Sequence, residues 1–275
     1  MTFGGDVSQI ARLFEDTKMP IEFSSGMPYH KDNIATFLAY AGKKLVHNYF
    51  PAPEVPFVLN LASKDETTRI NSIKHCTSAI EISAKGGVSF YCAHAGFLID
   101  PNLEELGAKI EIDPDIEIND QKKLFLDSIE QILKVADQFN IDFYIENNVL
   151  ASFNYKSPAQ EIPFFCCESK DICSLFQEIN HPKFGLLLDT AHLKVSCKTL
   201  DLDLESEFHK IKHLIKAIHH SDNNGFIDSN EKLTTNYWFL KHLPQFKYID
   251  HVVEVKNLTI DEINSQIDLI KNHFL

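Results

Sequence analysis

The chain has 275 residues, with 26 Lys and Arg against 39 Asp and Glu, so its formal net charge is −13. About 44% of the residues are apolar, which is enough to bury a core and argues against a disordered chain. No apolar run approaches the ~20 residues of a membrane-spanning helix. The N-terminus lacks the basic and apolar regions of a signal peptide, so we expect a cytoplasmic protein with no membrane partner. The acidic charge also disfavours nucleic acid, because DNA and RNA binders usually present a basic face.

Short apolar runs alternate with stretches of helical periodicity, which predicts βα units on a parallel sheet. Runs with strand character lie at 20–23, 44–47, 88–94, 141–146, 184–189, 215–219 and 248–254, and a weaker one near Thr2-Phe3-Gly4 would make eight. Eight strands with intervening helices in this length predict an α/β fold, a (β/α)8 TIM barrel whose single domain spans residues 1–275. The alternative, an open doubly wound sheet, normally shows a Gly-rich first turn, and the sequence has no GxGxxG motif or P-loop.

Two helix starts have the pattern of a capping box. One is Ser63-Lys64-Asp65-Glu66, which is followed by Ile70, Ile73, Thr77 and Ile80 on one predicted face. The other is Thr259-Ile260-Asp261-Glu262.

The six cysteines form neither a redox pair nor a zinc-finger spacing, so we expect reduced, mostly buried thiols.

Six predicted strands end in a histidine or an acidic residue: His47, His94, Glu146, Asp189, His219 and Glu254. Because the C-terminal ends of barrel strands converge on one rim, these residues would become neighbours there. Three imidazoles and three carboxylates are costly to bury together without a partner, and a divalent cation resolves the conflict. Mixed carboxylate and imidazole ligands suit Mn, Zn, Co or Fe, with Mg if carboxylates dominate.

Four of these strand ends resemble motifs of a known superfamily. Asp189-Thr190-Ala191-His192 looks like the Asp-x-x-His of the xylose isomerase-like TIM-barrel superfamily, and His219-His220-Ser221-Asp222 is similar to its seventh-strand His-x-x-Asp. Glu146 and Glu254 resemble its fifth- and eighth-strand glutamates, and the resemblance spans residues 20–257. The superfamily contains sugar isomerases, sugar 3-epimerases, inosose dehydratases and endonuclease IV-type AP endonucleases.

The resemblance implies roles at the matching positions. Glu146, Asp189, His219 and Glu254 are the expected ligands of a single metal, and the two glutamates are also expected to exchange protons with substrate carbon. His192 is expected to hold a substrate oxygen. His47 and His94 match further histidines of the AP endonucleases, which with Glu146 would hold a second metal. Asn60-Leu61-Ala62-Ser63 also resembles that branch.

The chain departs from both branches. The AP endonucleases complete a third metal site with Asp-x-His after the seventh strand, where this chain has Asp228-Ser229-Asn230. The ketose 3-epimerases have an arginine shortly after the seventh-strand histidine, and Asn223-Asn224-Gly225-Phe226 contains none.

Two carboxylates beside a cation point to carbon-acid chemistry. A metal that chelates a hydroxy-carbonyl substrate acidifies the adjacent C–H by stabilising the enediolate, and Glu146 and Glu254 can then remove and return the proton. We therefore predict a metal-dependent isomerase or epimerase of a small sugar-like substrate, in a chain that can form a homo-oligomer. Two alternatives stay open. One is a dinuclear phosphoester hydrolase, supported by His47 and His94, and the other is a barrel that binds a sugar or scaffolds a partner without catalysis.

Several further residues near the strand ends are candidates for binding substrate. Lys256, two positions past Glu254, is expected on the same face of the strand, where it contacts a substrate oxyanion or lies at the surface. Asp222 and His94 are also candidate substrate contacts, and Asp228 is a substrate or metal contact or a turn former. Glu22 is interpreted as a helix cap in preference to a contact with a substrate hydroxyl.

Aromatic residues and loops complete the prediction. Tyr237-Trp238-Phe239 is interpreted as packing core in preference to a sugar-stacking platform. Two long loops, 96–119 and 150–163, are expected to shape specificity at the rim.

Overall fold

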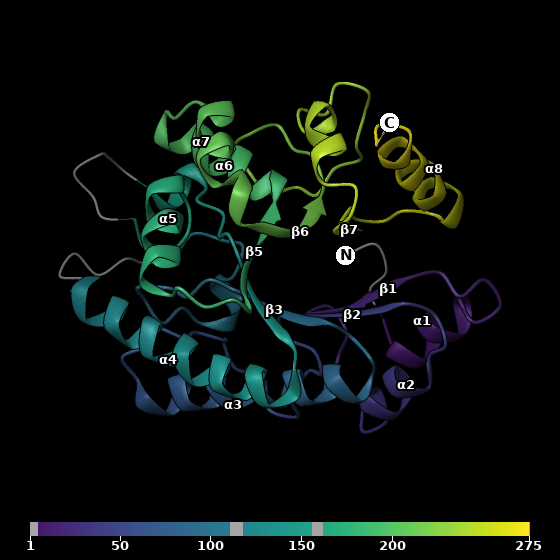
Figure 1. Ribbon diagram of the computed structural model, residues 1–275, viewed down its shortest axis with the longest axis horizontal. Helices are drawn as coiled ribbons and strands as arrows, with labels where there is room; N and C mark the ends of the chain where they lie inside the picture. The colour runs from purple at the N-terminus through teal and green to yellow at the C-terminus, as the bar shows by residue number, and fades with distance from the viewer. Residues whose placement is uncertain (1–4, 111–117, 156–161, 275) are drawn as a thin grey trace.

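A computed structural model describes residues 5–110, 118–155 and 162–274 (Figure 1). In this part of the chain, seven parallel strands form one sheet in chain order. They are β1 (Ile21–Phe23), β2 (Lys44–His47), β3 (Phe90–His94), β4 (Asp142–Glu146), β5 (Phe184–Asp189), β6 (Ile215–His220) and β7 (Asp250–Val253). Each coincides with a predicted run to within a few residues. The weaker strand predicted near Thr2-Phe3-Gly4 lies outside the described residues.

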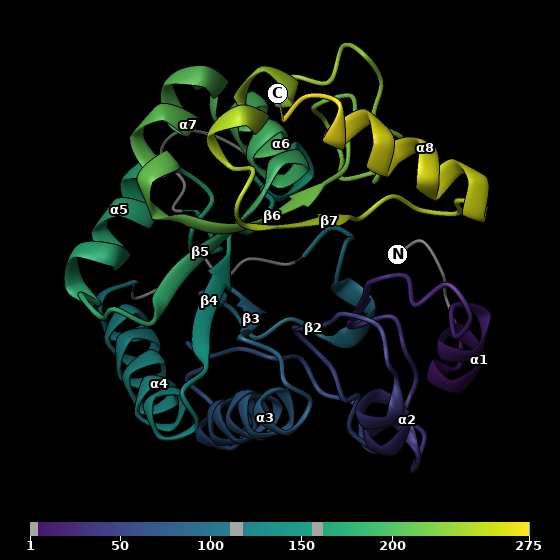
Figure 2. The same ribbon diagram turned by 45° about the vertical axis from the view of Figure 1, so that its right-hand side comes forward.

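Helices surround the strands (Figure 2). They are α1 (Val7–Leu13), α2 (Asn33–Ala39), α3 (Glu66–Lys85), α4 (Ile118–Phe139), α5 (Ser169–Glu178), α6 (Thr190–Leu200), α7 (Leu204–Ile211) and α8 (Ile260–Lys271). Short 3-10 helices lie at η1 (Leu103–Glu105), η2 (Ser152–Asn154), η3 (Lys212–Leu214) and η4 (Leu240–Gln245). In the described residues, no helix has both the length and the apolar character needed to cross a membrane.

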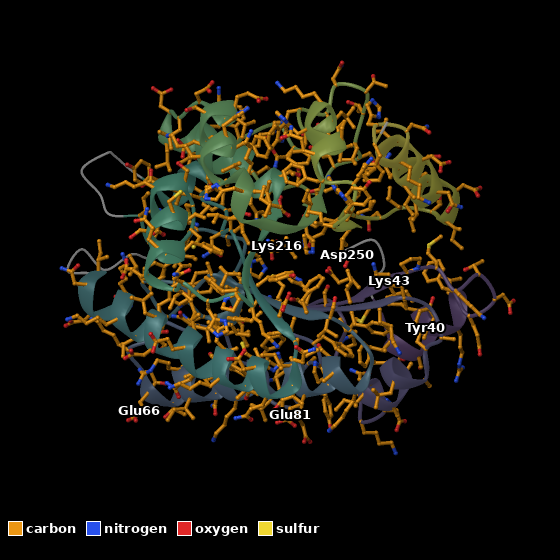
Figure 3. The ribbon with its side chains drawn as sticks, viewed as in Figure 1. Tyr40, Lys43, Glu66, Glu81, Lys216 and Asp250 are labelled. Carbon is orange, nitrogen blue, oxygen red and sulfur yellow. The ribbon has the colours of Figure 1, made fainter. Side chains whose placement is uncertain are left out.

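The sheet curls into a nearly closed barrel. At the carboxyl ends of the strands, Glu22 of β1 contacts His219 of β6, and the rings of His47 and His219 are 4.8 Å apart. At the amino ends, Lys43 before β2 forms an ion pair with Asp250 of β7 (Figure 3). Side chains from strands so far apart in the sheet order meet only if the sheet closes on itself. The predicted TIM barrel is therefore confirmed.

The barrel interior is filled by alternating large and small side chains. All six residues of β5 are buried, which explains its nearly continuous apolar sequence. Tyr144 of β4 stacks on Phe90 of β3 with ring centroids 4.5 Å apart. A Cβ atom added to Gly185 would lie 2.6 Å from the Tyr144 ring and from Lys216 Cγ, so glycine is required at this layer.

One predicted capping box is confirmed and the other is wrong. At α8, Thr259 Oγ1 accepts from Glu262 N at 3.3 Å and Glu262 Oε2 accepts from Thr259 N at 2.8 Å. At α3 the cap is Asp65, which accepts from Thr68 N at 2.8 Å, while Ser63 Oγ accepts from Asp65 N. The charged Asp65 is the stronger acceptor, so the helix begins after it rather than after Ser63.

The predicted apolar face of α3 is confirmed in part: Ile80 is fully buried and Ile73 packs against the core. Ile70 is 39% exposed, and the helix turns Ser72, Cys76, Ala79 and Ser83 toward the barrel. These small residues let α3 pack closely against the sheet. The hydroxyl of Ser72 also accepts a hydrogen bond from Asn60 N at 2.9 Å. Periodicity of large apolar residues therefore located only part of the buried side of the helix.

The aromatic run after β6 packs in the core, as predicted. Phe208 of α7 is fully buried and its ring lies 5.9 Å from that of Trp238 and 5.4 Å from that of Phe239. The cysteines are free and all but Cys173 are buried, which agrees with the prediction of reduced, mostly buried thiols.

The two long rim loops pack against each other. Phe97 and Phe164 form an antiparallel bridge, and Asn154 Oδ1 accepts from Ile110 N at 2.9 Å. Part of each predicted loop, residues 111–117 and 156–161, lies outside the described residues. Their role in specificity stays a prediction.

Candidate metal centre

The strand-end residues meet at the carboxyl end of the barrel. His94 is paired in register with Glu146, and Asp189 with His219. Adjacent strands therefore place the side chains of each pair at the same height along the barrel. Glu146, Asp189, His219 and Glu254 each offer one ligand atom within 4.8 Å of the others. The structure thus brings together the four residues predicted from the sequence. Their role as ligands remains a prediction.

Four atoms of this cluster are buried without a hydrogen-bond partner in the part of the chain that is described: Glu146 Oε1, Asp189 Oδ2, His219 Nδ1 and Glu254 Oε2. A buried polar atom left unsatisfied costs about 1–3 kcal/mol, and more if it is charged. One such atom comes from each proposed ligand, and all four face the same space. Because both carboxylate oxygen and imidazole nitrogen bind divalent transition metals, this donor set fits a cation.

The carboxylates of the cluster differ in their electrostatic surroundings. Burial raises the pKa of Asp189 to about 8; His192 opposes this rise, while Glu254 and Asp228 add to it. Burial would also raise the pKa of Glu254, but the imidazole of His219 outweighs it and lowers the value to about 2. Asp189 is therefore the carboxylate that most needs a counter-charge in order to ionise.

His219 is held between acidic groups on both of its ring nitrogens. Its Nε2 is 3.0 Å from Glu22 Oε1, while its Nδ1 is 2.8 Å from Glu254 Oε2 and 3.3 Å from Glu146 Oε1. Burial opposes protonation, but Glu22, Glu254 and Glu146 raise the pKa of His219 well above its usual value. A cation at this point would replace the proton on Nδ1.

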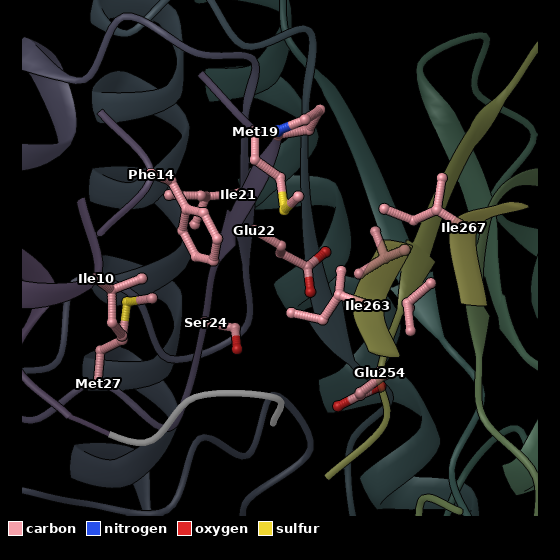
Figure 4. A pocket seen from close by; sticks show the side chains of 13 residues that line it. Ile10, Phe14, Met19, Ile21, Glu22, Ser24, Met27, Glu254, Ile263 and Ile267 are labelled. Carbon is pink, nitrogen blue, oxygen red and sulfur yellow. The ribbon is translucent and has the colours of Figure 1, made fainter. Parts of the chain in front are cut away.

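Glu22 belongs to the site, and the interpretation of it as a helix cap is wrong. The residue that precedes α2 is Asp32, whereas Glu22 points into the barrel from the end of β1. Figure 4 shows the carboxylates of Glu22 and Glu254 in a pocket whose other walls are mainly apolar side chains of α1, β1, β7 and α8. The alternation of side chains along β1 turns Glu22 inward between buried Ile21 and Phe23.

A second cluster adjoins the first. His47 Nε2 is 2.7 Å and His94 Nε2 is 3.4 Å from Glu146 Oε2, and these three residues also offer ligand atoms within 4.8 Å of one another. The two oxygens of Glu146 therefore face different clusters, as those of a bridging carboxylate do. Burial lowers the pKa of His94 to about 4, which keeps its imidazole neutral and able to donate a lone pair.

His192 lies beside the first cluster with a defined orientation. Its Nδ1 donates to the carbonyl oxygen of Asn147 at 2.8 Å, so Nε2 is directed toward Asp228 Oδ2 at 3.4 Å and Asp189 Oδ2 at 3.9 Å. Nε2 thus lies beside the Asp189 carboxylate of the first cluster. Binding of substrate by His192 remains a prediction.

Two of the other candidates are placed less favourably. Asp222 Oδ1 accepts from Lys194 Nζ at 2.6 Å, so its carboxylate is already engaged in an ion pair. Lys256 lies exposed in a turn, because β7 ends at Val253, and the expectation that it continues the strand beyond Glu254 is wrong. The chain turns after Val253, so the side-chain alternation of β7 does not extend to Lys256.

Asn147 is a site residue that the sequence did not single out. It is buried directly after Glu146, donates from Nδ2 to Asp189 O at 3.1 Å, and accepts from Asp189 N at 2.8 Å. It thereby locks the end of β4 to the end of β5. The only signal in the sequence was an amide residue next to a strand-end acid.

The fold is shared with several solved structures. No curated protein sequence matches the chain. A D-tagatose 3-epimerase-like protein superposes with a TM-score of 0.69 at 17% identity, over 92% of this chain and 86% of that one. D-psicose 3-epimerase with D-tagatose from Clostridium cellulolyticum H10 gives 0.65 at 13%, over 99% and 96%. The TTHB071 protein from Thermus thermophilus, soaked with ZnCl2, gives 0.66 at 14%, over 99% and 97%.

At these identities the solved structures show a shared fold. A sequence model of the family described as xylose isomerase-like TIM barrel matches residues 11–257, nearly the whole of the chain and all seven strands. The match covers the strand ends that carry the clustered acids and histidines. The chain therefore belongs to the xylose isomerase-like TIM barrel family.

Proposed function

We propose that this protein is a divalent-metal-dependent isomerase or epimerase of a small, sugar-like hydroxy-carbonyl substrate. The observation that carries the proposal is the convergence of four buried atoms without a hydrogen-bond partner, one each from Glu146, Asp189, His219 and Glu254. Two of these residues are glutamates from different strands, as proton transfer on two sides of a carbon requires. The names of the similar solved structures, a D-tagatose 3-epimerase-like protein and a D-psicose 3-epimerase, support the substrate class.

A cation held by these four residues would supply Lewis acidity, making the C–H next to a bound carbonyl easier to ionise. Glu254 is the glutamate best placed to take that proton, because its side chain is 26% exposed and lines the pocket between β1 and β7. Its pKa near 2, set by His219 against the effect of burial, keeps it ionised at neutral pH. His192 Nε2 orients a substrate oxygen beside it. Glu146 is fully buried and can act only on the inner side of the substrate.

Solvent exchange tests this proposal. Protein loaded with Mn²⁺, Co²⁺ or Zn²⁺ is incubated in D2O with a panel of ketoses and keto-polyols, and deuterium at carbon is followed by NMR. We expect exchange with at least one substrate and its loss in Glu254→Gln. Glu130→Gln, which changes an exposed glutamate of α4, is the matched control and should keep full exchange. Failure of every substrate with every metal would refute the proposal.

A second candidate is a dinuclear phosphoester hydrolase, and the cluster of His47, His94 and Glu146 favours it. Two divalent cations would also balance the four carboxylates of Glu22, Glu146, Asp189 and Glu254. In that arrangement Glu146 uses both oxygens as a ligand and has none left to move a proton. The charge of −13 argues against a nucleic acid substrate.

Counting bound ions separates the two candidates. One tightly bound ion per chain, unaffected by His94→Ala, supports the isomerase. Two ions, one of which is lost in His94→Ala together with hydrolysis of bis(p-nitrophenyl) phosphate, support the hydrolase. Anomalous scattering from crystals of the loaded protein would locate the ions directly.

A further inference from the structure

We propose that Glu22 is a positioning residue that selects Nδ1 of His219 as the nitrogen that binds metal. The inference rests on the metal centre of the proposed function and adds to it a residue that acts on a metal ligand and not on the cation itself. Glu22 is on β1, and it acts on a ligand from β6, a strand far from β1 in the sheet order.

A hydrogen bond joins the side chains of Glu22 and His219. Glu22 Oε1 lies 3.0 Å from His219 Nε2. A carboxylate oxygen accepts hydrogen bonds, so when a cation replaces the proton on Nδ1, the remaining proton of His219 is on Nε2, where Glu22 accepts it. The lone pair is then on Nδ1, the nitrogen that faces Glu254 Oε2 at 2.8 Å and Glu146 Oε1 at 3.3 Å.

Burial strengthens the effect of Glu22 on the proton position of His219. His219 is fully buried and the side chain of Glu22 is 9% exposed, so water cannot easily take over the bond. In the part of the chain that the structure describes, Glu22 is the hydrogen-bond partner of Nε2. The His47 ring, 4.8 Å away and nearly edge-on at 71°, restricts how the imidazole can turn.

A carboxylate behind a metal-bound histidine has two separable effects. Its lone pair fixes which nitrogen carries the proton, and its charge increases the basicity of the other nitrogen. In Glu22→Gln the amide oxygen still accepts from Nε2, so orientation is kept and only the charge is lost. In Glu22→Leu both effects are lost at similar volume. Mutation of a residue that hydrogen-bonds a metal ligand typically lowers metal affinity by about 10- to 100-fold.

Zinc binding and NMR test the inference without any assay of catalysis. Affinity for Zn²⁺ is measured by competition with a chelating dye, and the ring nitrogens of His219 are observed in the 15N-labelled, Zn²⁺-loaded protein. We expect the affinity to fall in the order wild type, Glu22→Gln, Glu22→Leu, with about a 10- to 100-fold loss in the last. We also expect a protonated Nε2 in wild type and Glu22→Gln, and a mixture of proton positions in Glu22→Leu.

The pair of Glu205 and His242 provides a matched control. Glu205 Oε2 lies 3.0 Å from His242 Nε2, and the His242 side chain is 7% exposed, but the pair is remote from the centre. Glu205→Leu should therefore remove a similar bond and leave Zn²⁺ affinity unchanged. Equal losses in Glu22→Leu and Glu205→Leu would indicate general destabilisation and overturn the inference.

Other results would overturn it in different ways. Affinity within about twofold of wild type in Glu22→Leu, with Nε2 still protonated, would show that Glu22 does not select the nitrogen. Loss of one whole equivalent of Zn²⁺ would make Glu22 a ligand, with His47 and His219, instead of a positioning residue. Wild-type protein that binds no Zn²⁺ would remove the metal centre itself. Absence of epimerase activity, by contrast, would refute the proposed function and leave this inference standing.

Discussion

Binding of one metal ion to the four-residue cluster should release about two protons at pH 7. Burial raises the pKa of Asp189 to about 8, so this carboxyl is about nine-tenths protonated at pH 7 in the metal-free protein. Against the effect of burial, neighbouring carboxylates hold the pKa of His219 well above its usual value, so His219 contributes about one more proton. Glu254, with a pKa lowered to about 2 by His219 despite burial, contributes none.

Binding of a second ion would release a different number of protons from the protein. Despite burial, Glu146 and Glu22 raise the pKa of His47, so displacing its proton adds up to one more. Burial lowers the pKa of His94 to about 4, so His94 adds none. The total for two ions is therefore about three protons, against about two for one ion. The count distinguishes the isomerase site from the dinuclear site.

Calorimetric titration measures this count. Zn²⁺ is added to chelator-treated protein in buffers of different ionisation enthalpy, and the slope of apparent binding enthalpy against that enthalpy gives the protons released. Raising the pH through 8 should remove the Asp189 contribution, because that carboxyl is then already ionised, and apparent affinity should rise. Release of fewer than about one proton at pH 7, or a count independent of pH, would refute the reasoning.

Three further outcomes follow from the structure. Stability of the metal-free protein should fall as pH rises toward about 8, because burial raises the pKa of Asp189 to about 8 and, against burial, carboxylates raise that of His219, so the protons bound in the folded state are lost; Tm of the loaded protein should stay nearly constant. Phe208→Ala should lower the free energy of unfolding by about 3–5 kcal/mol in urea titrations, because the ring is fully buried among aromatic neighbours, and a loss under about 1 kcal/mol would contradict this. Gly185→Ala should cost about 1–3 kcal/mol by forcing its Cβ against Tyr144, and an unchanged unfolding midpoint would count against that packing.

The strands and four of the clustered residues were predictable because the barrel imposes a simple rule. Each strand carries its functional side chain at its carboxyl end, and the register of parallel strands places Asp189 opposite His219 and His94 opposite Glu146. Apolar runs fix where strands end, so a list of strand ends already contained the cluster. No long-range information was needed beyond closure of the sheet.

The errors arose where local signals competed. Glu22 is followed by a loop and a helix, which suggested a cap, and only the closed barrel shows that it faces His219 from β6. Lys256 was placed by strand alternation, yet β7 ends at Val253 and a turn follows. In α3 the buried side contains Ile80 and Ile82 but is otherwise built from small residues, which carry little hydrophobic signal in the sequence.

Glu146 decides which chemistry the barrel can perform. Its Oε2 is 2.7 Å from His47 Nε2, and its Oε1 faces His219 Nδ1 at 3.3 Å. If a cation occupies only the four-residue cluster, Oε2 stays hydrogen-bonded to His47, and the protonation of His47 tunes the glutamate as a base. If a second cation lies between Glu146, His47 and His94, both oxygens become ligands and the glutamate cannot accept a proton from carbon. His47→Gln separates these cases, because it should shift the pH profile of exchange in a one-ion isomerase and should remove an ion from a two-ion hydrolase.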